Sequence, residues 1–367
     1  MKVILSGGGT GGHIYPALAI AAQIKKTRSD AEIVFVGTEA GLEKDIVPRY
    51  GYEIRFISVE GFKRSLSLNT VHSAMRLLVG LKDAYKLLTE LQPDLVIGTG
   101  GYVCGPIVFL AAMRGIPTVI QEQNAMPGVT NKILARYVKR VFLGYREAEK
   151  YFGGDSIKVF TGNPVRNEVM RCKRVEAIEA LGLDPDKLTI LVSGGSRGAI
   201  SINNAMLYVE DALAGRADVQ VLHATGDANY EKFIGELSKT AKDADNIIVK
   251  PYLHDMPMAL AAADLAVFRA GAIGLAELTV RGVPAVLIPY PFATANHQEF
   301  NARALEAAGA AKMLLDKSLT GESLLAELEH LLLHPDQLQK MKEAARSVGR
   351  PNAVKEITQQ ALQLVKK

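Results

Sequence analysis

The chain is poor in cysteine: among its 367 residues only Cys104 and Cys172 occur. Two cysteines this far apart in the sequence provide neither a disulfide framework nor the close spacing of metal ligands. We therefore expect the protein to work in a reducing compartment. No uninterrupted apolar stretch reaches the roughly 20 residues that a membrane-spanning helix needs. The longest candidate, residues 95–113, is broken by glycines and by Pro106. No signal peptide is expected, because glycines follow the first short apolar run at once.

Basic residues exceed acidic ones only slightly, with a net charge of +4, but they are unevenly distributed. Residues 61–88 carry five Lys or Arg side chains against Asp83 alone, and residues 132–140 carry four with no acid. Aromatic residues do not alternate with these cations as on single-strand nucleic-acid surfaces, so no nucleic-acid partner is expected. Cations beside apolar helical positions favour an anionic membrane surface instead.

Short apolar runs alternate with helix-like patterns along the chain, which is typical of α/β proteins with parallel sheets. Strands are expected near residues 3–6, 33–36, 54–57, 95–98, 117–120, 140–143, 157–161, 189–193, 219–224, 246–249, 264–268, 284–288 and 311–315. The length suffices for two domains, and the polar segment 168–186 predicts a boundary near residue 164. We therefore expect an N-terminal domain over 1–164, a C-terminal domain over 165–340, and a last helix within 341–367 that packs back on the N-terminal domain.

A glycine-rich run follows the first expected strand. Five of the six residues from Gly7 to Gly12 are glycines, and a helix-like pattern with Pro16 in its first turn comes next. Backbone N–H groups and the helix dipole favour an anion at a helix N-terminus, and glycines let it approach closely. The run therefore predicts a site for an anion or a sugar nucleotide.

Two better-known phosphate motifs fit this run poorly. The glycines satisfy G-x-G-x-x-G, but no acid closes the second expected strand, where Gly37 and Thr38 follow Val36. That acid holds the ribose in dinucleotide-binding proteins, so a pyridine-nucleotide oxidoreductase is disfavoured. A phosphate loop needs Lys and then Ser or Thr after its last glycine, and this chain has His13 and Ile14 there.

The same strand, glycine turn and helix recur along the chain. A turn at residues 98–105 follows another apolar strand, and the second half opens with a strand and a turn at residues 194–198. Ligands of doubly wound sheets bind at the carboxyl ends of strands. We therefore expect the turns of each sheet to lie together along the edge formed by those ends, which is the rim of the sheet. Asn124 belongs to a polar cluster that ends the next strand, and this cluster is either a solvated loop or part of the site.

Two segments of the second half add polar side chains to that rim. Glu277 follows a further strand and glycine turn. An acid there either compensates the helix dipole or accepts hydrogen bonds from ribose hydroxyls. Gln298 lies in a run of amides beside His297. Amides both donate and accept hydrogen bonds, which suits sugar hydroxyls.

Six motifs together closely resemble the MurG family, the N-acetylglucosaminyltransferases of bacterial peptidoglycan synthesis. In chain order they are Gly7-Gly8-Gly9-Thr10-Gly11-Gly12-His13, Gly100-Gly101-Tyr102-Val103-Cys104-Gly105-Pro106, Glu122-Gln123-Asn124, Thr161-Gly162-Asn163-Pro164-Val165-Arg166, Gly194-Gly195-Ser196-Arg197-Gly198 and Asn296-His297-Gln298-Glu299. The match spans nearly the whole chain, and the combination is far more specific than any one motif.

The resemblance implies a GT-B fold, with two Rossmann-like, doubly wound parallel-sheet domains that face each other across a cleft. It implies inverting transfer of GlcNAc from UDP-GlcNAc to the MurNAc 4-hydroxyl of undecaprenyl-pyrophosphoryl-MurNAc-pentapeptide (lipid I), giving lipid II and UDP without a metal or other cofactor. It also implies a peripheral position on the cytoplasmic face of the cell membrane, with cell-wall synthesis proteins as partners. A GT-B enzyme with another lipid acceptor and a UDP-GlcNAc 2-epimerase are the alternatives.

The resemblance also assigns roles to positions. Donor contacts are implied for Thr10, Gly11, Gly12, Asn124, Arg166, Ser196, Leu253 and Gln298, with Glu277 on the ribose. His13 and Tyr102 are implied on the acceptor side and in catalysis. An imidazole can take the proton of the attacking hydroxyl near neutral pH, and a single histidine can equally orient its loop. Gly274 stands where the family usually carries Thr, so a hydroxyl that could bind diphosphate is absent there.

Overall fold

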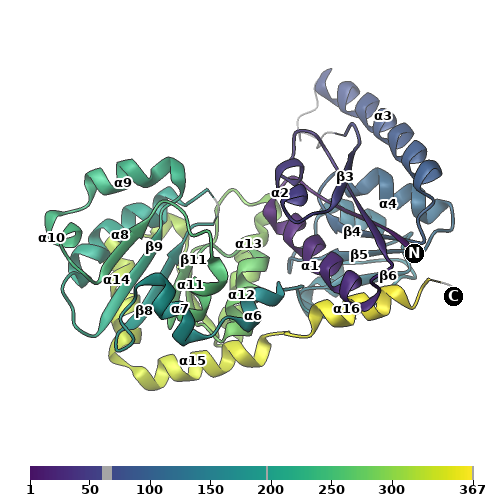
Figure 1. Ribbon diagram of the computed structural model, residues 1–367. Coiled ribbons are helices and arrows are strands. Elements are labelled where there is room, and N and C mark those ends of the chain that lie inside the picture. Colours follow the sequence, from purple (N-terminus) through teal and green to yellow (C-terminus); the bar gives the residue numbers. More distant parts are fainter. Residues whose placement is uncertain (60–67, 196, 366–367) are drawn as a thin grey trace. The chain divides into compact units, whose positions relative to one another are not determined.

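The chain folds into two units, each built on its own sheet, in the computed structural model (Figure 1). The first unit comprises Met1–Arg166 and Pro351–Lys367, and the second comprises Asn167–Arg350. The structure describes residues 1–59, 68–195 and 197–365, without the side chains of residues 68–77.

Seven parallel strands form the sheet of the first unit, in the order β3-β2-β1-β4-β5-β6-β7. They are β1 (Lys2–Gly7), β2 (Glu32–Gly37), β3 (Glu53–Phe56), β4 (Leu95–Gly100), β5 (Thr118–Glu122), β6 (Arg140–Leu143) and β7 (Ile157–Phe160). The strand order reverses between β1 and β4, and the crevice at the carboxyl ends of such strands binds ligands in doubly wound folds. The glycine turns after β1 and β4 therefore lie on neighbouring strands at this point.

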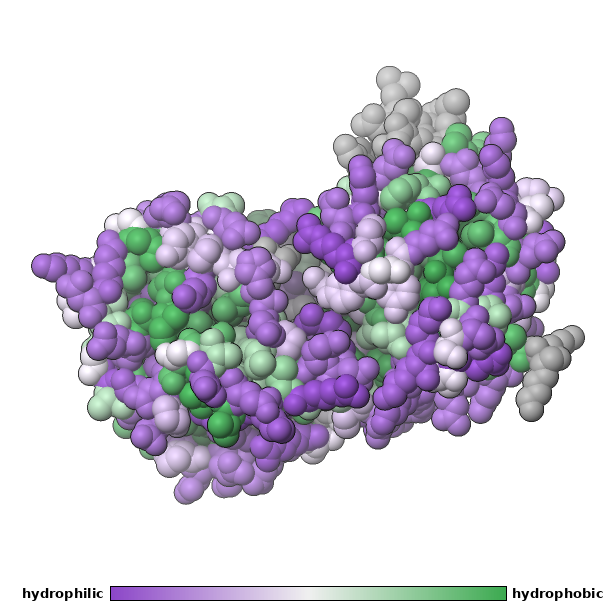
Figure 2. All heavy atoms as spheres, in the orientation of Figure 1, coloured by the Kyte–Doolittle hydropathy of each residue, from purple (hydrophilic) through white to green (hydrophobic). Residues whose placement is uncertain are grey.

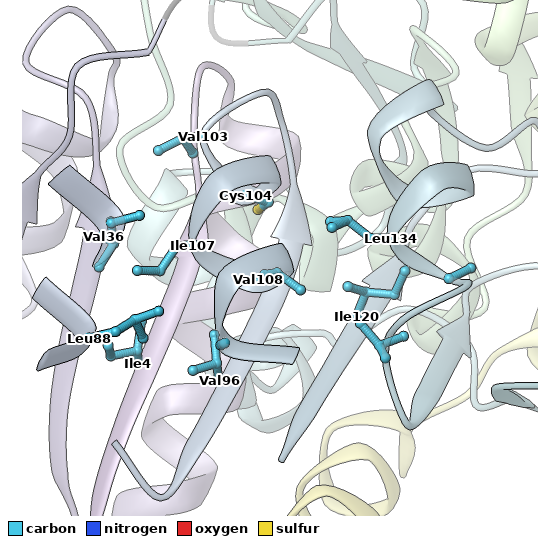
Figure 3. Close-up of a cluster of buried hydrophobic side chains, with 14 of the residues drawn as sticks. Ile4, Val36, Leu88, Val96, Val103, Cys104, Ile107, Val108, Ile120 and Leu134 are labelled. Atoms are coloured by element: carbon cyan, nitrogen blue, oxygen red, sulfur yellow. The ribbon is translucent and has the colours of Figure 1, made fainter. Parts of the chain in front are cut away.

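Helices cover both faces of this sheet. They are α1 (Gly11–Thr27), α2 (Glu43–Arg49), α3 (Leu68–Leu91), α4 (Cys104–Met113), α5 (Val129–Leu134) and α16 (Ala353–Leu362), with the 3-10 helix η1 (Arg146–Tyr151). Successive side chains of a strand point to opposite faces. Ile4 accordingly packs with Leu88 of α3 and Ile107 of α4 (Figure 3). Val3 and Leu5 belong to the other layer, which includes α1 and α16.

The last helix, α16, packs on α1 of the first unit and buries Ile357 and Ala361 completely. Nη1 of Arg140, at the start of β6, donates to the carbonyl oxygen of Gln360 over 2.7 Å. Apolar burial and this hydrogen bond together hold the end of the chain on the first sheet.

The limits of the two compact units differ from the predicted domain limits at two points. The first unit extends to Arg166 rather than to residue 164. The returning segment begins at Pro351 rather than at residue 341. The reason is that α15 (Pro335–Val348) buries Leu338 and Met341 in the core of the second unit.

Six parallel strands form the sheet of the second unit, in the order β10-β9-β8-β11-β12-β13. They are β8 (Leu188–Ser193), β9 (Val219–Ala224), β10 (Ile247–Lys250), β11 (Leu265–Phe268), β12 (Ala285–Leu287) and β13 (Ala311–Met313). Besides α15, the helices are α6 (Asn167–Arg171), α7 (Arg174–Leu181), α8 (Ile200–Leu213), α9 (Tyr230–Glu236), α10 (Lys239–Lys242), α11 (Met256–Ala262), α12 (Ala272–Arg281), α13 (His297–Ala307) and α14 (Gly321–Leu333), with the 3-10 helices η2 (Asp227–Asn229), η3 (Thr294–Asn296) and η4 (Asp316–Ser318).

The predicted α/β architecture with two doubly wound parallel sheets is confirmed. Each predicted strand is present, and its ends lie within two residues of the prediction. Over the residues that the structure describes, no helix combines the length and the apolar character that crossing a bilayer requires.

Candidate active site

Two glycine turns of the first unit pack directly on each other at the carboxyl ends of β1 and β4. The N–H of Gly8 faces the carbonyl oxygen of Gly100 over 3.4 Å. A Cβ at Gly101 would stand 2.5 Å from the carbonyl oxygen of Gly8. Gly9, Gly100 and Gly101 also have positive φ angles, which other residues rarely adopt. Close packing and backbone conformation therefore both require glycine here.

His13 lies half-buried in the first turn of α1, beside these glycine turns. Its Nδ1 is 3.0 Å from the carbonyl oxygen of Thr99 and 2.9 Å from Oε1 of Gln123. The Thr99 hydroxyl donates to the carbonyl oxygen of His13 over 2.7 Å. Both the ring and the backbone of His13 are therefore tied to the end of β4. Among the described residues, no hydrogen bond engages Nε2.

Tyr102 and Cys104 belong to the turn after β4. The Tyr102 ring stands over Gly9, whose Cβ, if present, would be 3.7 Å from Cε1. Cys104 is completely buried, and its Sγ lies 2.7 Å from the carbonyl oxygen of Ser6. Burial raises the pKa of this thiol to about 11, so it stays neutral and links the turn to β1.

Glu43, at the start of α2, fixes the first glycine turn from the side of β2, and the sequence reading did not single it out. Its carboxylate is buried and accepts from the N–H of Gly9 and the N–H of Thr38, both over 2.9 Å, and from the Thr38 hydroxyl over 3.0 Å. The only signal was an acid near a helix start, which normally indicates compensation of the helix dipole. The N–H of Gly9 is thus committed to Glu43.

Asn124 follows β5, the neighbour of β4 in the sheet, and is held by Glu122. The Glu122 carboxylate accepts from the N–H of Asn124 over 2.9 Å and from its side-chain Nδ2 over 3.1 Å. It also accepts from Asn131 Nδ2 over 2.9 Å. Asn124 therefore lies in a loop at the same rim as His13, and Glu122 gives it a defined orientation there.

Thr10, Gly11 and Gly12 form the N-terminus of α1. The Thr10 carbonyl oxygen accepts from the N–H of His13 over 3.1 Å, and the residues at positions 10 and 12 are exposed. Arg166, the last residue of the first unit's long segment, stacks its guanidinium 5.1 Å from the centre of the Tyr15 ring on α1. This arrangement brings a cation to the helix end where backbone N–H groups favour an anion.

The glycine turn after β8 begins the rim of the second unit. Ser196 lies outside the described residues, but the turn around it is defined by Gly195 and Gly198, which both have positive φ angles. A Cβ at Gly198 would collide with the carbonyl oxygen of Thr225, after β9. The turn therefore packs backbone against backbone, as the turns of the first unit do.

Glu277, Gly274 and Leu253 follow other strands of the second sheet. Glu277 is a buried residue of α12, within its second turn. A Cβ at Gly274 would stand 3.7 Å from Cδ1 of Phe268, an ordinary contact, so the structure has room for a Cβ at this position. Leu253 is buried after β10.

Gln298 lies in the first turn of α13 and anchors the loop before it. Its Oε1 accepts from the N–H of Tyr290 over 3.0 Å. Ala295 and Asn296, just before the helix, both have left-handed backbone conformations, a form of strain that is concentrated at functional sites. The side chain of Asn296 and that of Arg303 lower the pKa of the neighbouring Glu299 carboxyl. The hydrogen bond from Tyr290 to Gln298 therefore fixes the loop before α13 to the start of that helix.

Arg269, after β11, was also missed as a site residue. Its Nη1 donates to the carbonyl oxygens of Ile288 and Pro289, both over 3.2 Å, and pairs with Asp316. Its Nη2 donates to the Ser201 hydroxyl over 2.7 Å. One guanidinium therefore ties together the segments that follow β8, β11, β12 and β13.

The predicted site residues divide between the units. The first unit holds Thr10, Gly11, Gly12, His13, Tyr102, Asn124 and Arg166, and the second holds Leu253, Glu277 and Gln298. Each group follows the carboxyl ends of its own strands, which is where doubly wound folds bind ligands. Among the described residues, no group of three or more His, Cys, Asp or Glu side chains is arranged to hold a metal ion.

Both units match glycosyltransferase domains. Residues 3–143 match the glycosyltransferase family 28 N-terminal domain, and residues 189–359 match the glycosyltransferase family 28 C-terminal domain. A protein of Desulfitobacterium hafniense (strain Y51) is 51% identical over 359 residues, 97% of each chain. A protein of Bacillus subtilis (strain 168) is 48% identical over 353 residues, 96% of each chain. Both are named UDP-N-acetylglucosamine--N-acetylmuramyl-(pentapeptide) pyrophosphoryl-undecaprenol N-acetylglucosamine transferase.

Solved structures agree with this assignment. Acinetobacter baumannii MurG has a TM-score of 0.79 at 29% identity and covers 99% of both chains. The UDP-GlcNAc 2-epimerase of Neisseria meningitidis has a TM-score of 0.69 at 13% identity, covering 99% of this chain and 100% of the other, so it shares the fold alone. The predicted GT-B fold and glycosyltransferase class are confirmed. The chain belongs to the MurG family of N-acetylglucosaminyltransferases, within glycosyltransferase family 28.

Proposed function

We propose that this protein transfers GlcNAc from UDP-GlcNAc to the MurNAc 4-hydroxyl of lipid I with inversion at the anomeric carbon, giving lipid II and UDP. One observation carries the proposal: relatives 48–51% identical over nearly the whole chain are named for transfer of this sugar to this class of lipid. Likeness to 2-epimerases is limited to the fold, at 13–15% identity. No observation favours epimerisation over transfer.

In the proposed reaction, the acceptor hydroxyl attacks the anomeric carbon while its proton passes to Nε2 of His13. The bond between that carbon and the β-phosphate oxygen breaks, and UDP leaves with the electron pair. The transition state is oxocarbenium-like, so negative charge grows on the departing diphosphate. Arg166, the turn around Ser196 and the helix N-terminus at Gly11 and Gly12 are proposed to stabilise that charge. Charge-assisted hydrogen bonds supply this stabilisation without a metal ion.

The remaining assignments concern recognition. Glu277 is proposed to accept from the ribose hydroxyls, and Gln298 and Asn124 to bind polar groups of the donor sugar. Leu253 is proposed to contact the donor through its apolar side chain. Tyr102, over Gly9, is proposed to act beside His13 on the acceptor side. With no threonine at position 274, backbone N–H groups and Ser196 are proposed to bind more of the diphosphate.

The acceptor carries a long lipid, and one face of the first unit suits a membrane surface. Exposed apolar side chains on α3, on α4 and on or just after α5 are Leu78, Val79, Tyr85, Met113, Val129, Ile133 and Tyr137. Exposed cations of this region include Lys82 and Lys86 on α3, Arg114 just after α4, and Arg136 just after α5. Figure 2 shows hydrophobic side chains interspersed with hydrophilic ones on the visible surface of the first unit. The basic positions within residues 60–67 lie outside the described residues.

This face is proposed to hold the protein peripherally on the cytoplasmic leaflet, so that the acceptor is used without leaving the bilayer. We expect Lys82→Glu with Lys86→Glu to weaken binding to vesicles of anionic lipid at least thirtyfold, since each lost cation removes about 1 kcal/mol of attraction. Vesicle co-sedimentation measures this, and added salt should weaken binding of the unmodified protein as well.

The matched control carries the same charge change on another helix. Lys25→Glu with Lys26→Glu alters exposed residues at the end of α1, in the layer on the opposite face of the sheet. Equal losses in the two double variants would contradict a specific membrane face and indicate an effect of net charge alone.

A transfer assay tests the proposed function. Purified protein, labelled UDP-GlcNAc and a lipid I analogue are incubated with EDTA, and we expect label in the lipid product at a rate within about twofold of that without chelator. Loss of transfer with EDTA would contradict the charge stabilisation proposed here. Conversion of the donor to its 2-epimer without an acceptor would contradict the transferase reading. Transfer only to a different lipid would contradict the proposed acceptor.

A further inference from the structure

Three side-chain amides lie buried behind His13, at the carboxyl ends of β5 and β7. Gln121 and Gln123 are 0% and 1% exposed, and Asn163 is 4% exposed. The proposed reaction leaves all three without a role. An amide group cannot be buried without hydrogen bonds except at a cost of about 1–3 kcal/mol, so their arrangement needs a reason.

Backbone carbonyl oxygens fix the orientation of each amide, because a carbonyl oxygen can only accept. Asn163 Nδ2 donates to the carbonyl oxygen of Gln123 over 2.9 Å, which leaves Oδ1 of Asn163 to accept from Gln121 Nε2, also over 2.9 Å. Gln121 Nε2 donates to the carbonyl oxygen of Glu122 as well, over 3.1 Å. Gln121 Oε1 is therefore turned toward Gln123.

Gln123 is oriented in the same way. Its Nε2 has only acceptors around it: the carbonyl oxygen of Thr99 at 2.6 Å, that of Gln121 at 3.0 Å, and Gln121 Oε1, so its two N–H groups point to this side. Its own Oε1 must then face Nδ1 of His13, 2.9 Å away. The other neighbour of Nδ1, the carbonyl oxygen of Thr99, is also an acceptor. Nδ1 of His13 therefore has two acceptors and no donor, and it must carry a proton.

The position of that proton decides what His13 can do. A neutral imidazole has one protonated and one unprotonated nitrogen, and only the unprotonated nitrogen can accept. Free histidine prefers the proton on Nε2, and that form would leave Nε2 unable to take a proton from a hydroxyl. The amide network selects the opposite form, with Nε2 unprotonated.

We propose that Gln123 is a positioning residue that holds His13 in the Nδ1–H tautomer, with Gln121 and Asn163 fixing the orientation of its amide. The inference rests on the proposed function for the statement that Nε2 takes the proton of the acceptor hydroxyl. The tautomer itself is a property of the resting protein and does not depend on turnover.

Nitrogen-15 NMR of the full chain labelled at histidine tests the proposal, since the two ring nitrogens differ strongly in shift when one carries the proton. We expect unmodified His13 to be in the Nδ1–H form. Gln123→Met keeps the size of the side chain but removes the acceptor oxygen. We expect this variant to show a measurable share of the Nε2–H form and a kcat lowered roughly ten- to hundredfold. The KM for UDP-GlcNAc should stay within twofold.

Two further variants separate positioning from general damage. Gln123→Glu retains an acceptor oxygen toward Nδ1 and is expected to keep Nδ1 protonated. Gln220→Met makes the same exchange at a buried glutamine of the second unit, bonded to Asp184 and Thr189, and should leave His13 and kcat unchanged.

An Nε2–H tautomer in the unmodified protein would overturn the proposal, even if Gln123→Met does not fold. A Gln123→Met variant with unchanged tautomer and kcat would also overturn it, because the carbonyl of Thr99 would then suffice. Absence of GlcNAc transfer by the unmodified protein would instead overturn the proposed function, and the NMR result would stand apart from it.

Discussion

Replacing His13 with alanine is expected to lower kcat by about 10²- to 10⁴-fold, the usual contribution of a general base. The attacking hydroxyl must lose its proton as the new bond forms, and the proposed reaction gives that proton to Nε2 of His13. Affinity for UDP-GlcNAc should change little, because the donor contacts are proposed for other residues. Steady-state turnover with a lipid I analogue and calorimetric titration with UDP-GlcNAc measure the two quantities separately.

The alanine variant should keep the shape of the glycine turn. The Thr99 hydroxyl donates to the backbone carbonyl of His13, and that bond does not need the ring. Ile14, the next residue, is completely buried and anchors the start of α1. The lost activity can therefore be attributed to the imidazole rather than to a collapsed turn.

His330→Ala is the matched control, because His330 is exposed on α14 and its Nε2 lies 2.8 Å from Oε1 of Gln337, a side chain of the second unit. It should retain full activity. A His13→Ala variant that keeps more than a tenth of the normal kcat would contradict the assignment of His13 as base. If Tyr102→Phe lost most of its kcat while His13→Ala stayed active, the role of general base would be assigned to Tyr102 instead.

Most of the fold was predictable from local patterns. Short apolar runs such as Val3 to Leu5 are buried on both sides of the sheet, so each strand appears in the sequence as a continuous hydrophobic segment. Glycines after those strands were predictable as turns because the required φ angles and close contacts exclude other residues. The order of strands and turns was therefore enough to predict which turns lie at the rim of each sheet.

The residues that hold the site's turns in place were not predictable, because their partners are distant in the sequence and meet them only in the folded chain. Glu43 reaches the N–H of Gly9 across 34 positions of sequence, and Arg269 meets Asp316 across 47. Neither has a distinctive neighbourhood in the sequence. The end of the second unit was misplaced for the same reason: α15 and α16 are both amphipathic helices, and their patterns do not show on which core each one packs.

A buried pair in the second unit, Glu210 and His223, is a further support of this kind. Both side chains are 0% exposed, and Nδ1 of His223 is 2.7 Å from Oε1 of Glu210. Asn203 Nδ2 donates to the carbonyl oxygen of Thr225 over 3.0 Å, so its Oδ1 accepts from Nε2 of His223 over 3.2 Å. One proton is therefore shared between Nδ1 and the carboxyl group, and the pair is neutral as a whole. Through Asn203, it braces the Thr225 carbonyl on which the Gly198 turn packs.

His223→Leu is expected to lower the opening free energy of this unit by about 3–5 kcal/mol, the cost of leaving one member of a buried pair without its partner. Leucine fills most of the ring's volume, so the loss is not that of a cavity. Glu210→Gln should cost only about 1 kcal/mol, since its N–H donates to Nδ1 of a neutral imidazole and one hydrogen bond replaces another. Native-state hydrogen exchange of the β9 amides measures both values, and the β1 amides of the other unit serve as an internal control.

The contrast between the two variants decides whether the pair or its packing stabilises the unit. The edge of the His223 ring meets Phe233 of α9 with 4.9 Å between ring centres, so a contribution from packing alone is a real competitor. If packing dominated, leucine would cost about 1.5 kcal/mol or less, as exchanges of similar volume usually do. Equal costs for His223→Leu and Glu210→Gln would contradict the shared proton, because only the leucine variant leaves the buried carboxyl without a partner on His223. A large difference, confined to β9 and absent from β1, is expected if the hydrogen-bonded pair of Glu210 and His223, with Asn203, stabilises the second sheet.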